Sequence, residues 1–203
     1  MKTEKDHIQE LAEIRSMMEK SSKFLFLSGL AGIFAGTYAL IGAYLAISYF
    51  NFNPDVILYD YTSGDPFQVI LLAAVVLILS IFTALAFSSR KASKAGEKIW
   101  NASTRRLLGH IAVPLLAGGL IVLTFFSQTL YGLMAPFTLI FYGLALFIAG
   151  KFSLVELKVM GVIQIIFGIV ALWAIEWSMI IWGIGFGVMH IAYGLFVYIK
   201  YER

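Results

Sequence analysis

Residues 67–88 read FQVILLAAVVLILSIFTALAFS, a stretch without a single charged side chain. A helix that crosses a membrane needs about 20 such residues, because the hydrocarbon core of a bilayer is about 30 Å thick. Similar stretches recur along the whole chain. Hydropathy predicts six membrane-spanning helices, at 23–50, 67–88, 108–126, 130–149, 155–175 and 178–199.

The overall composition points to the same class of protein. Of the 203 residues, 60% are hydrophobic and 13% are charged, and the mean hydropathy is +0.86. Soluble domains are about 45–50% apolar and about 25% charged, so soluble enzymes and nucleic-acid-binding proteins are excluded. The chain has no cysteine, which excludes disulfides and thiolate metal sites. We therefore expect an all-α polytopic membrane protein.

The basic residues predict which way the bundle lies in the membrane. Lys and Arg collect in cytoplasmic loops, and all fifteen lie before the first span, between spans 2 and 3, between spans 4 and 5, or at the end of the chain. The opposite side carries only acidic residues: Asp55, Asp60, Asp65 and Glu176. This asymmetry predicts a multi-pass membrane protein with both termini in the cytoplasm.

Two segments outside the predicted spans have patterns of their own. Residues 4–20 place Ile8, Leu11, Ile14 and Met18 at helical spacing between charges, which predicts an amphipathic cytoplasmic helix within residues 1–22. This helix could lie on the membrane surface, or it could bind a protein partner or a second copy of the chain. The basic loop 89–107 is expected to attract anionic lipid of the bilayer. The transmembrane domain is then 23–199, and 200–203 form a cytoplasmic tail.

Small residues follow helical spacing in several predicted spans. Helices in lipid associate through close packing, and glycine lets two backbones approach each other. The residues expected to pack helices together are Gly32, Gly36, Gly161, Gly168, Gly183, Gly187 and Gly194.

Two polar residues lie on those small-residue faces. Gln164 and His190 are at similar depth in the hairpin formed by the last two spans, so we expect an interhelical hydrogen bond between them. The alternative is a ligand or proton site, because ionisable groups within a membrane often serve a function.

A second polar cluster is expected near the cytoplasmic surface. His110 and Glu156 lie at similar depth, and Arg105 and Arg106 are close in sequence to His110. We expect these four residues to lie near one another.

The residues required by several membrane enzymes are missing from the sequence. Three histidines cannot form a multi-histidine iron site, and no HExxH zinc motif occurs. No pair of carboxylates lies within the spans for acid–base chemistry. The sequence therefore predicts no catalytic residue, no metal site and no cofactor.

Several segments together resemble a known family. These are MMEKSSKFLFLSGLAGIFAG (17–36), KIWNASTRRLL (98–108), VPLLAGG (113–119), LIFYGLAL (139–146) and GFGVMHIAYGLFVYIKYER (185–203). They are similar to a family of uncharacterised small six-span bacterial inner-membrane proteins, some of which carry a carotene-monooxygenase label. The resemblance implies the six-span topology and a location in the cell inner membrane, and it transfers no catalytic residue.

Three functional classes follow from the sequence. The first is a non-enzymatic interaction, sensory or regulatory membrane protein, favoured by the amphipathic segment and by the missing chemistry. The alternative is a transporter or channel for a small solute or lipid, favoured by the small-residue faces around Gln164 and His190. A membrane-embedded enzyme is the second alternative.

Overall fold

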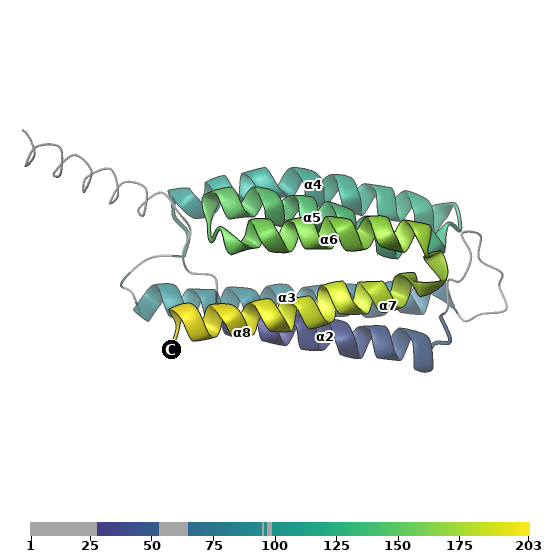
Figure 1. The fold of residues 1–203 in the computed structure, drawn as a ribbon, viewed down its shortest axis with the longest axis horizontal. Coiled ribbons are helices and arrows are strands. Elements are labelled where there is room, and N and C mark those ends of the chain that lie inside the picture. Colours follow the sequence, from purple (N-terminus) through teal and green to yellow (C-terminus); the bar gives the residue numbers. More distant parts are fainter. Residues whose placement is uncertain (1–27, 53–64, 95, 97–98) are drawn as a thin grey trace, which may run out of the picture.

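The computed structural model describes residues 28–52, 65–94, 96 and 99–203 (Figure 1). The expected amphipathic helix over 4–20 and most of the loop 51–66 lie outside these residues. The helices are α2 (Gly29–Ser48), α3 (Pro66–Lys94), α4 (Ala102–Ser127), α5 (Met134–Phe152), α6 (Glu156–Trp173), α7 (Ser178–Trp182) and α8 (Met189–Tyr201), with short turns η1 (Tyr131–Leu133) and η2 (Ile175–Trp177) and a π-helical segment η3 (Gly183–Val188).

The predicted fold class is confirmed for the described part of the chain. It contains only helices, and six helical stretches are long and apolar enough to cross a membrane. Each coincides with one predicted span. Helix α4 begins six residues before the predicted residue 108, because the Asn101 side chain caps it by accepting a hydrogen bond from the Thr104 backbone at 2.9 Å. The last span is not one continuous α-helix, since η3 interrupts it.

The six spans form two units of three helices each. Figure 1 shows α4, α5 and α6 in one layer and α2, α3 and α7–α8 in the other. In the first layer α5 packs along both α4 and α6, and in the second α2 packs along both α3 and α8. We call these layers the α5 unit and the α2 unit.

Each unit contains one helix pair in close backbone contact. In the α2 unit, a Cβ atom added to Gly194 would lie 2.5 Å from the Gly29 carbonyl oxygen, and one added to Gly36 would lie 2.5 Å from the Gly187 carbonyl oxygen. In the α5 unit, a Cβ atom on Gly161 would lie 2.6 Å from the Gly143 carbonyl oxygen. Antiparallel α2 and α8, and likewise α5 and α6, therefore approach through glycine.

The remaining predicted packing glycines differ in how closely they are packed. Gly32 lies against the α8 backbone, Gly168 against the α5 backbone, and Gly187 against the Leu40 side chain. Gly183 has more room, because a Cβ atom there would be 3.8 Å from its nearest neighbour, the Cβ of Ala43.

The two units contact each other mainly through α7, which packs on α5 and α6 close to the turn η2. We call this the η2 end of the bundle. The opposite end carries Arg105, Arg106, Lys151 and Lys200, and we call it the basic end.

Candidate polar centre between the two helical units

The π-helical segment η3 has the sequence GIGFGV and lies where α7 passes into α8. Single π-helical turns inside α-helices occur frequently at functional sites. Glycines 183, 185 and 187 are all buried in this segment. Gly183 and Gly187 face α2 of the same unit, whereas Gly185 faces the side chains of Leu139 and Gln164 in the α5 unit.

Gln164 of α6 is fully buried and faces this segment. Its exposed fraction is 0%, and its Nε2 donates a hydrogen bond of 2.7 Å to the Gly185 carbonyl oxygen. Its Oε1 has no hydrogen-bond partner among the described residues. The amide nitrogen thus joins the two units, whereas the amide oxygen is an acceptor without a hydrogen bond among the described residues.

His190 of α8 reaches the same carbonyl oxygen and a third helix. Its Nδ1 lies 3.3 Å from the Gly185 oxygen, and its Nε2 lies 2.7 Å from the Tyr142 hydroxyl of α5. A carbonyl only accepts, so Nδ1 carries the proton of a neutral ring, and Nε2 then accepts from the tyrosine O–H. A neutral His190 is fully satisfied by these two bonds.

The expected direct hydrogen bond between Gln164 and His190 is not formed. The two residues do meet, but both donate to the Gly185 oxygen, because η3 places that carbonyl between their side chains. Gln164, Gly185, His190 and Tyr142 are called the polar centre below.

Aromatic and hydroxyl side chains surround the polar centre. The Phe186 ring lies 4.9 Å from the Tyr142 ring and is nearly parallel to His190, with ring centroids 5.8 Å apart. Trp182 of α7 donates from Nε1 to Thr138 of α5 at 3.0 Å. Two side-chain hydrogen bonds therefore connect α5 to the α7–α8 segment.

A side chain at position 185 would require the ends of two neighbouring side chains to shift. A Cβ atom there would lie 2.6 Å from Leu139 Cδ2 and 2.7 Å from Gln164 Oε1. Sequence reasoning did not select Gly185, although it selected the neighbouring Gly183 and Gly187. Tyr142 was also missed, and its position in the middle of a span was a usable signal, because membrane tyrosines favour the two interfaces.

A second buried acceptor lies one helical turn further along α8. The Tyr193 hydroxyl has no hydrogen-bond partner among the described residues, and its ring packs on Leu107, Ala149 and Leu157 of the α5 unit. The Ser178 hydroxyl at the start of α7 is a third such group, so buried groups without partners among the described residues lie on both sides of Gln164, toward the η2 end and toward the basic end.

The expected cluster of four residues near one surface is not assembled. Glu156 instead accepts hydrogen bonds from Lys200 at 2.7 Å and from the Tyr201 hydroxyl at 2.8 Å. His110 donates from Nδ1 to the Arg106 carbonyl oxygen at 2.7 Å and lies on the Phe152 ring. The prediction was wrong for Glu156, which faces α8. The other three residues, Arg105, Arg106 and His110, do lie together, on an outer face of α4.

Glu202 has a role that the sequence did not reveal. Its Oε1 accepts from the Gly29 backbone N–H at 2.9 Å and from Lys91 Nζ at 3.0 Å. This carboxylate caps the start of α2 and joins it to α3, where negative charge is favoured at a helix N-terminus. Residues expected to form a free tail thus help to hold the α2 unit together.

Comparison with known proteins adds no relative. No family model matches the chain, and neither a curated protein nor a solved structure is significantly similar to it.

Proposed function

We propose that this protein is a membrane carrier that binds a small uncharged polar solute at the polar centre and passes it between the α2 and α5 units. The observation that carries the proposal is the fully buried Gln164 with its free Oε1. An unpartnered buried polar atom costs about 1–3 kcal/mol. A hydroxyl or amide N–H of a solute is the natural partner for this oxygen.

The position of the polar centre supports the same proposal. Solute sites in many carriers lie near the middle of the membrane, between two helical bundles, beside a helix that departs from regular α geometry. Here η3 is such a segment, and Gln164 and Tyr142 face it from the other unit. Amide, imidazole and phenol groups recognise neutral hydroxyl and amide groups through hydrogen bonds.

The contacts between the units suggest how the site is reached. At the η2 end, α7 packs on α5 and α6. At the basic end, the ion pair of Glu156 with Lys200 joins α6 to α8. Breaking one set of contacts while keeping the other would open the polar centre to one side of the membrane at a time. We place this bundle in the cytoplasmic membrane with its basic end inside, on the strength of the basic-residue asymmetry.

Cysteine accessibility tests the proposal, because the chain has no cysteine of its own. Gln164→Cys and Tyr193→Cys are treated in proteoliposomes with a charged, membrane-impermeant methanethiosulfonate, and modification is read as a mass increase of the intact protein. Val188→Cys is the matched control. Val188 lies in the same span as Tyr193 and at nearly the same depth as Gln164, but its side chain is exposed on the outer surface of the bundle.

A carrier is expected to react at Gln164→Cys or Tyr193→Cys from at least one side, while Val188→Cys stays unmodified in lipid. If neither inner position reacts, water does not reach the centre and the proposal fails. Reaction at all three positions would mean that the bundle is loosely folded, which also contradicts it.

An interaction role stays a prediction, because residues 4–20 lie outside the described part of the chain. Deleting them and measuring the complex by native mass spectrometry tests it. A protein partner or second copy that is lost on deletion, from a bundle that is still folded, would favour that function over transport.

A further inference from the structure

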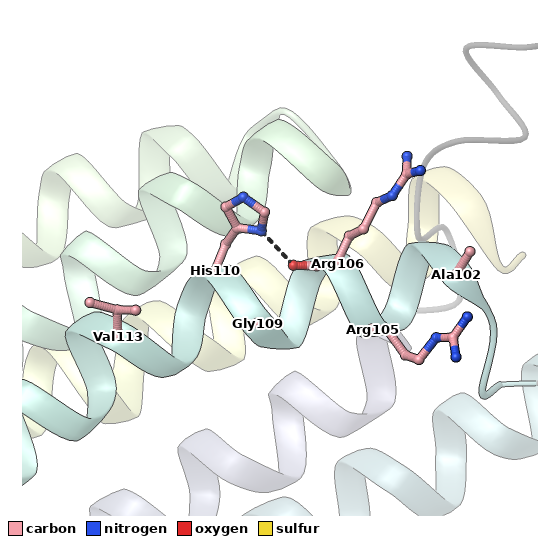
Figure 2. A pocket seen from close by; sticks show the side chains of 6 residues that line it. All are labelled: Ala102, Arg105, Arg106, Gly109, His110 and Val113. Atoms are coloured by element: carbon pink, nitrogen blue, oxygen red, sulfur yellow. Dashed lines mark hydrogen bonds between the residues drawn. The ribbon is translucent and has the colours of Figure 1, made fainter.

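A shallow hollow lies on the outer face of α4 at the basic end of the bundle. Figure 2 shows the residues that line it, all from this one helix: Ala102, Arg105, Arg106, Gly109, His110 and Val113. All six are exposed. In the figure, Arg105 and Arg106 leave the helix on opposite sides, and Gly109 follows them along the helix next to His110.

The two arginines are not neutralised by the carboxylates described at this end. Glu156 is bound to Lys200 and Tyr201, and Glu202 is bound to Lys91 and the start of α2. Within the residues that the structure describes, neither guanidinium forms an ion pair. Two exposed positive groups thus face the hollow, and guanidinium is the side chain best suited to phosphate.

His110 and Gly109 add to the same surface. His110 donates from Nδ1 to the Arg106 carbonyl oxygen, so Nε2 of the neutral ring is an acceptor that is left to receive a hydrogen bond from a hydroxyl of a lipid headgroup. A Cβ atom added to Gly109 would meet nothing within 4 Å, so this glycine is not needed for packing between the described helices. It leaves the helix backbone uncovered one turn after the two arginines.

The surface next to the hollow is apolar and continuous with it. Val113 is 69% exposed, Leu116 67% and Leu120 66%, and their spacing puts them along one side of α4 leading away from the arginines. A ligand that fits both parts has an anionic head and a long apolar tail. A soluble phosphate would use only the first part.

We propose that this face of α4 binds one anionic membrane phospholipid, with its phosphate at Arg105 and Arg106, a headgroup hydroxyl at His110, and an acyl chain along Val113, Leu116 and Leu120. The site is independent of the polar centre between the units. The sequence predicts that the basic loop 89–107 attracts anionic lipid in general. This proposal assigns the lipid to a single site on one face of α4.

The test measures lipid retained by the purified full-length protein in native mass spectrometry, after exchange into mixed micelles of phosphatidylglycerol and phosphatidylcholine. The double variant Arg105→Gln/Arg106→Gln is expected to weaken phosphatidylglycerol retention about thirtyfold, from two basic side chains near a membrane surface. Gly109→Leu keeps every charge but fills the hollow, so it should weaken retention as well. The matched control Lys151→Gln removes an exposed charge at the same end and should not.

Three results would overturn the proposal. A loss of about fivefold in Lys151→Gln, the size expected for one basic side chain near a membrane surface, would show general attraction to the basic end without a site. Unchanged retention in both α4 variants would place the lipid elsewhere. Displacement of the lipid by inorganic phosphate alone, at equal ionic strength set with chloride, would make the ligand a soluble phosphate. Thermal unfolding of each variant confirms that a loss of lipid is not a loss of fold.

Discussion

The substitution Gln164→Met tests whether the polar centre contributes to the free energy of unfolding. Methionine has a similar length and is also unbranched, so the space that the side chain occupies is nearly conserved. The change removes one hydrogen bond, from Gln164 Nε2 to the Gly185 oxygen at 2.7 Å, and one buried oxygen without a partner. The Gly185 oxygen still has His190 Nδ1 at 3.3 Å, so it is not stranded.

The two effects have opposite signs and different sizes. A hydrogen bond between membrane helices contributes about 0.6 kcal/mol, with a maximum near 1.7. Removing a buried, unpartnered polar atom returns about 1–3 kcal/mol. We therefore expect the free energy of unfolding of Gln164→Met to be unchanged or to rise by up to about 2 kcal/mol.

The assay is unfolding by sodium dodecyl sulfate in mixed micelles, followed by the fluorescence of Trp182 and the other tryptophans. Leu139→Ala is the control for sensitivity, because Leu139 is fully buried beside Gln164 and its truncation should cost about 2–5 kcal/mol. A loss above about 1.5 kcal/mol in Gln164→Met would refute the reasoning. It would mean that the amide is satisfied on both sides and holds the units together.

Two further predictions concern packing and capping. Gly194→Ala should lower stability by about 1–3 kcal/mol, because its methyl group would lie 2.5 Å from the Gly29 carbonyl oxygen. In the same unfolding assay Gly119→Ala should raise stability by up to about 1 kcal/mol, since nothing lies within 4 Å there; equal effects would contradict the packing described for α2 and α8. Glu202→Ala should cost about 1–2 kcal/mol through the lost cap of α2, and less in high salt. Glu176→Ala, an exposed acidic residue at the η2 end, should change stability by less than about 0.5 kcal/mol, and a similar loss in both variants would argue against the cap.

Gln164 and His190 show how far the sequence reached toward the candidate site. Counting residues from the turn between the last two spans brought both side chains to the same level, and the structure places them on one carbonyl oxygen. The carbonyl itself could not be foreseen, because a π-helical turn has the same apolar, glycine-rich composition as a regular one. Tyr142 was missed for a related reason, since its contact depends on how α5 lies against α8.

Glu156 shows that the depth of a residue in the membrane, counted from the sequence, does not predict its contacts. It shares its level with His110, yet it faces α8 and binds Lys200 and Tyr201. Depth along a helix follows from counting residues, whereas the direction around the helix axis depends on which helices become neighbours. The same limit hid Glu202, whose partners Gly29 and Lys91 are far from it in sequence.

The helices of the described residues, and the six that are long and apolar enough for a membrane, follow from the sequence alone, because these properties depend on local composition and on the thickness of a bilayer. Tertiary packing sets the grouping of helices into two units, the meeting of Gln164, His190 and Tyr142 around η3, and the outward face of Arg105 and Arg106. Within a lipid bilayer the hydrophobic effect does not favour one pair of helices over another, because lipid tails are as apolar as the helix surfaces. The arrangement of the helices is set by close contacts between small residues and by a few hydrogen bonds, which bring together residues that lie far apart in the chain.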